Sequence, residues 1–275
     1  MEETFSVGRR RIIECFPPGW AVLAGLGLLA LGVPVCSTAQ NPPNLNERPP
    51  IINSKAQAIL DKTIQALGGP AFLAFKSLTT TGRVFAIADD QTVGFAPFES
   101  FVEYPDKRRF SYGKKLPVVL INNGEKGWEI DRYGTISQKG EERRRWQLGN
   151  RYSMENILRV RLHEPGILVQ EAGEDFVDQA AVRMVSIVDA RQSQITLYVH
   201  RLTYLPVRIK YHVFNPITKE WDDYVDVFGD YKALQGIQTP MHITRFLNED
   251  RVSEIYRNSA KYNETYPAGT FEAPH

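Results

Sequence analysis

Histidines are the side chains in this sequence best suited to act as a general base or a metal ligand. There are five of them: His163, His200, His212, His242 and His275. No two have the His-x-His or His-Glu-x-x-His spacing that directs two ring nitrogens at one metal ion. His200 and His212 fall on the polar face of one predicted hairpin, where they either meet across it or remain two separate surface histidines. The sequence therefore predicts no metal site.

Carboxylates gather at Asp222, Asp223, Asp226 and Asp230, but without the fixed spacing and glycine of a calcium loop. The alternation through residues 224–228 predicts that Asp226 faces solvent. Gly-x-Ser-x-Gly and Gly-x-Gly-x-x-Gly motifs are absent from the sequence. We therefore expect no catalytic residue, no enzyme activity and no cofactor. A hydrolase remains an alternative only if the fold brings histidines and carboxylates together from distant positions.

The charge balance argues against nucleic acid as a partner. Lysine and arginine number 33 and aspartate and glutamate 32, which leaves a net charge of +1 and no basic stripe. The one arginine run, residues 143–145, precedes Trp146 in a segment compatible with a helix. Such a run is typical of a solvated helix face, and beside a tryptophan it is also able to contact lipid headgroups.

The first 39 residues have the pattern of a secretory signal peptide. Arginines at 9–11 precede an uncharged apolar run at 20–35, and small residues at 37–39 provide a cleavage site. The apolar run is shorter than the ~20 residues that a membrane-spanning helix needs. We expect a mature periplasmic chain that begins near Gln40 and does not span the membrane. The alternative is a lipid anchor on Cys36. Both cysteines lie in this leader, so the mature chain has no disulfide.

Two helices and many strands follow a linker at residues 40–53 and form one expected domain, residues 54–275. The clearest strands are 195–200 and 207–214, whose apolar and polar residues alternate with the period of two of a half-buried antiparallel hairpin. Similar segments recur from residue 77 to 138 and from 167 to 262. The helices are expected at residues 55–67 and within 141–162. This order predicts a mainly β protein with a single large antiparallel sheet.

A curved sheet with one apolar face needs a cover, and two short helices are a small cover for so many strands. Either an apolar cavity remains for a lipophilic ligand, or the helices seal the core. The candidate cavity residues share one face of the hairpin and its expected continuation: Leu197, Val199, Val207, Ile209, Tyr211, Val213, Val225, Val227, Met241 and Ile243. The candidate lid residues are Tyr104, Trp146, Ile157 and Leu158.

Four segments, in this order along the chain, resemble the periplasmic lipoprotein-carrier superfamily, the LolA/LolB-like outer-membrane lipoprotein-sorting proteins. Residues 101–110 (FVEYPDKRRF) are similar to the strand–proline–strand segment of that family, and residues 119–128 (VLINNGEKGW) to its Asn-Gly-x-x-x-Trp hairpin. Residues 203–208 (TYLPVR) and 236–240 (GIQTP) match in the second half, followed by Asn263 and residues 271–274 (FEAP).

The resemblance implies an incomplete β-barrel: a strongly curved antiparallel sheet whose concave face is plugged by a few helices. It also implies an apolar cavity for acyl chains, no catalysis, and a lipid or an acylated protein as partner. The family has an arginine directly before the proline of the first segment, which holds the lid shut, whereas this chain has Tyr104. The alternative is an envelope sensor or scaffold that uses the same fold for protein contacts without a ligand.

Overall fold

The computed structural model describes residues 48–274 and contains one curved sheet of 14 strands with a few helices. The helices are α1 (Ser54–Leu67), α2 (Pro70–Ala74), α3 (Gly140–Arg151) and α4 (Met154–Arg159), with a 3-10 turn η2 (Arg161–His163). The first seven strands are β1 (Ile51–Ile52), β2 (Ser77–Ala88), β3 (Gln91–Glu103), β4 (Lys107–Tyr112), β5 (Val118–Asn123), β6 (Lys126–Asp131) and β7 (Gly134–Ser137). The other seven are β8 (Leu168–Val177), β9 (Ala180–Val188), β10 (Gln194–His200), β11 (Pro206–Asn215), β12 (Glu220–Leu234), β13 (Ile237–Leu247) and β14 (Asp250–Tyr262).

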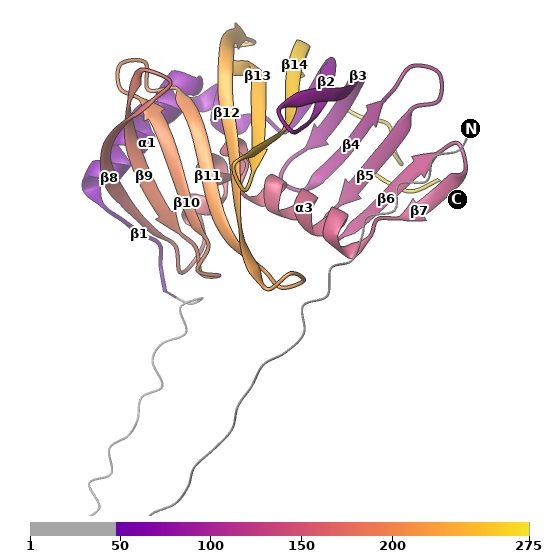
Figure 1. Cartoon of the computed structure of the whole chain (residues 1–275). Coiled ribbons are helices and arrows are strands. Elements are labelled where there is room, and N and C mark those ends of the chain that lie inside the picture. The colour runs from indigo at the N-terminus through magenta and orange to yellow at the C-terminus, as the bar shows by residue number, and fades with distance from the viewer. Residues whose placement is uncertain (1–47, 275) are drawn as a thin grey trace, which may run out of the picture. The chain divides into compact units, whose positions relative to one another are not determined.

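The strand order is β1-β8-β9-β10-β11-β12-β13-β14-β2-β3-β4-β5-β6-β7. Every neighbouring pair is antiparallel except β1 and β8, which are parallel. Two meanders, β2–β7 and β8–β14, therefore meet where β14 pairs with β2 (Figure 1). The sheet is strongly curved but not closed into a barrel, and helices lie within its curve, which confirms the fold class expected from the sequence.

The predicted hairpin is present, with Leu197 opposite Ile209 and Ile195 opposite Tyr211. These side chains face the concave side, where they join the largest hydrophobic cluster of the described residues. Helices α1, α2 and α4 contribute further residues to that cluster, so this half of the concave face is filled by packed side chains.

Helix α1 is bounded by specific capping residues. The side chain of Asn53 accepts hydrogen bonds from the backbone N–H groups of Lys55 (2.9 Å) and Ala56 (3.4 Å), as an N-cap should. Gly68 ends the helix with a φ of 130°, and a Cβ at this position would approach the carbonyl oxygen of Gly236 to 2.4 Å. Only glycine fits both the backbone angle and the close approach, which fixes where α1 lies on the sheet.

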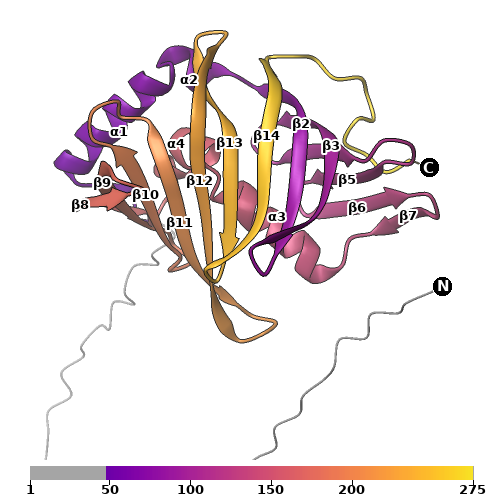
Figure 2. The same cartoon turned by 45° about the horizontal axis from the view of Figure 1, so that its top comes forward.

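Helix α3 has a different character, because none of its side chains is buried in the core. The residues Glu142, Arg145, Trp146, Gly149 and Asn150 follow the i, i+3, i+4, i+7, i+8 spacing of one helix face, and all line a cavity. The opposite side of α3 faces the filled half of the sheet. The helix therefore lies between the packed core and this cavity. Figure 2 shows α3 within the curve of the sheet.

The expected signal peptide at residues 1–39 and the possible lipid anchor at Cys36 lie outside the described residues. Ile51 and Ile52, expected in the linker, form β1 and pair with Leu168 and Val169 of β8. Within residues 48–274, none of the helices has the length and hydrophobicity needed to cross a bilayer.

Candidate functional site

A cavity of about 490 Å³ lies between α3 and the concave face of strands β13, β14 and β2–β6. Its volume is within the range of sites that enclose a small organic ligand. The lining alternates along each strand, as it must for side chains on one face of a sheet: Phe98, Ser100 and Val102 come from β3, and Arg108, Phe110 and Tyr112 from β4.

The apolar part of the lining is largely aromatic. The rings of Phe98 and Phe110 are stacked, with centroids 5.3 Å apart and planes inclined by 24°. Trp146 closes the cavity from α3, and Leu120 and Ile255 extend the apolar lining along β5 and β14. This part of the surface is suited to a hydrocarbon chain, because it offers apolar contacts without a polar group to satisfy.

The charged part of the lining consists of arginines and glutamates: Arg108, Arg145, Arg245, Arg257, Glu129, Glu142 and Glu155. Arg245 forms an ion pair with Asp226 on the neighbouring strand β12, with Nε 3.3 Å from Oδ1. Burial raises the pKa of Asp226, although the charges of Arg245 and Arg257 oppose this shift. Burial also lowers the pKa of Arg108 to about 9, and the charge of Arg245 adds to the shift. The cavity therefore has an apolar part and a cationic part.

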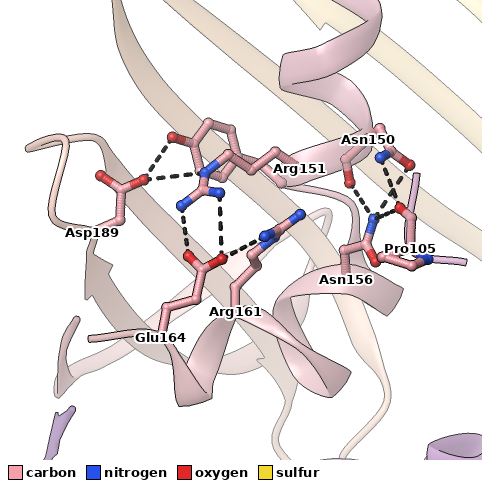
Figure 3. Close-up of polar contacts among 8 residues, drawn as sticks. Pro105, Asn150, Arg151, Asn156, Arg161, Glu164 and Asp189 are labelled. Atoms are coloured by element: carbon pink, nitrogen blue, oxygen red, sulfur yellow. Dashed lines mark hydrogen bonds and ion pairs between the residues drawn. The ribbon is translucent and has the colours of Figure 1, made fainter. Parts of the chain in front are cut away.

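Two asparagines attach the helical cover to the turn between β3 and β4 (Figure 3). The carbonyl oxygen of Pro105 accepts hydrogen bonds of 2.9 Å from the side-chain amides of both Asn150 and Asn156. The Asn156 amide also donates to the backbone carbonyl of Asn150 at 2.8 Å. Because Asn150 ends the cavity-lining face of α3, these bonds hold the cover over the cavity.

The opposite side of the helical segment is held by ion pairs (Figure 3). Glu164 accepts from Arg151, with Nη2 2.6 Å from Oε2, and forms a second ion pair with Arg161. The Arg151 guanidinium also lies 3.5 Å from the carboxylate of Asp189, which accepts a 2.8 Å hydrogen bond from the hydroxyl of Tyr152. These contacts join α3 to η2 and to the turn after β9.

Substituting Glu164 with glutamine tests this network through its pH dependence. Burial raises the pKa of Glu164, but hydrogen bonding to Arg161 and the charge of Arg151 outweigh that effect and lower it. A lowered pKa stabilises the folded state above the unfolded pKa of ~4.3, and this stabilisation is lost as pH falls through the folded pKa. We expect Glu164→Gln to lower the free energy of unfolding by about 1–2 kcal/mol at pH 7, and by progressively less below pH ~4.

Urea unfolding at several pH values measures this difference. Glu174→Gln is the matched control, because the Glu174 carboxylate makes only exposed ion pairs with Arg183 and Arg201, each at 3.6 Å. Exposed pairs contribute little, so the control is expected to change the free energy of unfolding by less than ~0.5 kcal/mol. An equal effect of both variants at pH 7 would contradict the prediction.

Most of the predicted cavity residues lie in the filled half of the sheet, away from this cavity. Five hairpin residues and one β13 residue belong to the packed cluster, with exposed fractions of 5% or less: Leu197, Val199, Ile209, Tyr211, Val213 and Ile243. Met241 is buried outside that cluster. Val207 has no pairing partner on β10, because the register of β10 with β11 shifts at this point. Its side chain is only half-buried. The cavity instead lies over β13, β14 and β2–β6.

The expectation that Val225 and Val227 continue the hairpin's inner face is wrong. Tyr224 pairs with Tyr211, and Asp226 with Ile209, so these two residues face inward and the valines face outward with Lys210 and Arg208. The prediction of a solvent-facing Asp226 is wrong for the same reason. Its charge is accommodated inside because Arg245 stands directly opposite on β13.

The lid candidates divide between the two halves. Tyr104 and Trp146 line the cavity, whereas Ile157 and Leu158 are buried in the packed cluster. The Arg159 guanidinium lies 4.9 Å from the centroid of the Tyr104 ring, so α4 supplies an arginine to this position. The prediction that residues 143–145 are a solvated face fails at Arg144, which donates to the carbonyl of Phe214 at 3.0 Å and pairs with a buried aspartate.

His200 and His212 do not meet. His212 pairs with Gln194 at one end of the hairpin, and the His200 ring accepts backbone N–H groups in the turn at the other end. The His212 ring nitrogen lies 2.7 Å from the Asp223 carboxylate, and its ring stacks on Trp221 at 4.6 Å. Across residues 48–274, no group of three or more histidine, cysteine, aspartate or glutamate residues is arranged to hold a metal ion.

The sequence analysis missed the lining contributed by β2–β5, although a signal for it was present. Phe98, Ser100 and Val102 alternate with residues of the outer face, as do Arg108, Phe110 and Tyr112. Both triplets lie in or beside the segment that resembles the lipoprotein carriers. Reading that alternation as an inner face would have found six lining residues.

A curved, open antiparallel sheet with a few helices recurs among solved structures. No protein-family model matches the sequence, and no curated protein is significantly similar to it. A DUF1329 family protein from Desulfovibrio piger matches with a TM-score of 0.53 and 11% identity, over 79% of this chain and 97% of that chain.

Two further structures carry the names that the sequence resemblance suggested. A Vibrio parahaemolyticus domain designated as outer membrane lipoprotein-sorting has a TM-score of 0.50 at 7% identity, over 79% of this chain and 97% of that chain. A LolA superfamily protein from Nitrosomonas europaea has a TM-score of 0.49 at 13% identity, over 78% and 96%. At these identities the likeness is one of fold, and at that level the resemblance expected from the sequence is confirmed.

Proposed function

We propose that this protein is a periplasmic carrier or binding protein that holds a lipid or an acyl chain in the cavity under α3. The observation that carries the proposal is the cavity itself: about 490 Å³, with the stacked rings of Phe98 and Phe110 below and Trp146 above. A hydrocarbon chain would remove these apolar surfaces from water, which stabilises a complex by ~25 cal/mol for each Å² buried.

The expected secretory signal and the fold likeness to a lipoprotein-sorting domain support the same proposal. The chain's partner would then be a lipid or an acylated envelope protein. The alternative is an envelope sensor or scaffold, whose surface contacts another protein and whose cavity stays empty. The two differ in one measurable property, which is whether a lipid occupies the cavity.

Native mass spectrometry of the full chain, purified from the envelope of its own cells, tests the proposal. We expect a fraction of the protein to carry a lipid-sized additional mass. Ser100→Trp should abolish it, because Ser100 lies on the cavity floor between Thr80 and Phe110 and a larger side chain would occupy the space.

Ser111→Trp is the matched control. Ser111 is a neighbour of Phe110 on β4, so its side chain projects from the opposite face of the sheet. The control should retain the additional mass. If neither the native chain nor the control carries a lipid, and neither takes one up from vesicles, the carrier proposal fails and the scaffold is favoured.

A further inference from the structure

Arg108, which lines the cavity, has no anionic partner among the described residues. Its Nε is buried without a hydrogen-bond acceptor, and its guanidinium makes no ion pair with any of the residues 48–274. Its nearest aromatic neighbour is Phe110, whose ring centroid lies 5.4 Å from the guanidinium carbon. Arg108 as a whole is half-buried, but a cation with a buried N–H that lacks an acceptor is costly, and protein structures usually supply a counter-charge.

A second arginine reaches the same cavity from the opposite side. Arg245 projects from β13 and Arg108 from β4, which are separated by β14, β2 and β3 in the strand order. Because the sheet is curved, both side chains line the same cavity. The charge of Arg245 contributes to the lowered pKa of Arg108. Guanidinium groups remain charged at neutral pH, so Arg108 and Arg245 add two positive charges to a cavity that Arg145 and Arg257 also line.

The acidic groups around the cavity do not neutralise both arginines. The carboxylate of Asp226 is paired with Arg245. Glu129 on β6, Glu142 on α3 and Glu155 at the start of α4 also line the cavity, but among the described residues none lies within ion-pair distance of Arg108. One anion between the two arginines would satisfy the unpaired guanidinium, and planar guanidinium groups bind carboxylate and phosphate oxygens well.

We propose that Arg108, assisted by Arg245, binds the anionic headgroup of a single-chain amphiphile, a carboxylate or a phosphate. The hydrocarbon chain would lie on the adjoining surface of Phe98, Phe110 and Leu120. This inference rests on the proposed function and deepens it: the ligand is an anionic lipid, not any apolar molecule. The cavity volume of about 490 Å³ suits one chain with its headgroup.

Calorimetric titration of the delipidated full chain tests the inference with four probes: palmitate, hexadecyl phosphate, hexadecanol and inorganic phosphate. We expect palmitate and hexadecyl phosphate to bind about 10- to 100-fold more tightly than hexadecanol, as charge-assisted hydrogen bonds in a buried site would give. Arg108→Gln should remove this preference and leave hexadecanol binding unchanged, and Arg108→Lys should retain part of it.

Arg109→Gln is the matched control, because Arg109 is the next residue on β4 and faces the other side of the sheet. It should bind all four probes as the native chain does. Equal affinity for palmitate and hexadecanol, unaffected by Arg108→Gln, would overturn the anion site while lipid binding stands. If inorganic phosphate bound as tightly as hexadecyl phosphate, the hydrocarbon chain would contribute nothing to binding, and the proposal of an amphiphilic ligand would be overturned. No binding of any chain-bearing probe would overturn the proposed function as well.

Discussion

Replacing Val199 with tryptophan is expected to lower the free energy of unfolding by about 3 kcal/mol, whereas Ser100→Trp should lower it by less than ~1 kcal/mol. Val199 is 0% exposed in the packed cluster, so a larger side chain must displace its neighbours. Ser100 borders the cavity, where the added ring has space. Chemical denaturation of both variants measures the difference.

Val227→Trp completes the comparison. Val227 lies on β12, opposite Arg208 of β11, and its side chain is on the outer face of the sheet. A tryptophan ring added there would contact solvent. We expect almost no change in stability and no change in lipid binding. Equal destabilisation by Ser100→Trp and Val199→Trp would show that the space under α3 is not available to side chains, and the site described above would lose its basis.

Asn156→Ala is expected to have the second large effect, about 2–3 kcal/mol of lost stability. The Asn156 side chain is 0% exposed and its amide donates to the backbone carbonyls of both Pro105 and Asn150. Alanine at this position removes the side-chain amide that donates to the backbone carbonyl of Asn150. We also expect faster amide hydrogen exchange in α3, because the bonds that attach its end to the β3–β4 turn are weakened.

Asn150→Ala serves as the comparison for this prediction. It removes only one of the two donors to Pro105, and the Asn156 amide still holds that carbonyl. Its effect on stability should be less than half that of Asn156→Ala. If the two variants were equally stable, or if exchange in α3 were unchanged in both, the asparagines would not be what holds the cover.

Local sequence pattern was sufficient to predict most of the fold. The ranges 77–138 and 167–262, where strands were expected, contain β2–β7 and β8–β14, because β-branched and aromatic residues are frequent there and turn residues separate the strands. The helix expected at residues 55–67 begins one residue earlier, at Ser54, where Asn53 provides the cap. These elements are determined by residues close together in the chain.

The location of the cavity could not be predicted in the same way. Both halves of the sheet have an apolar concave face, and the difference between them depends on which half α1, α2 and α4 cover. The inward position of Asp226 depends likewise on its pairing with Arg245, a residue distant in sequence. One local signal was available: the segment at 141–147 is charged and has a single large apolar residue, Trp146, which is too little for a helix packed into a core.

The pairing of β14 with β2 has a consequence for how the molecule folds. Tyr262 lies opposite Leu78, so the seam joins strands from nearly opposite ends of the described chain. Contacts this distant in sequence form late, because the loop between them must first be ordered. Each meander can form hairpins early, but residues of both meanders line the cavity. Arg245 and Ile255 belong to the meander β8–β14, and Phe98 and Arg108 belong to the meander β2–β7. The lining of the cavity is therefore complete only after β14 has paired with β2, and binding at the proposed site would report on completion of the whole sheet.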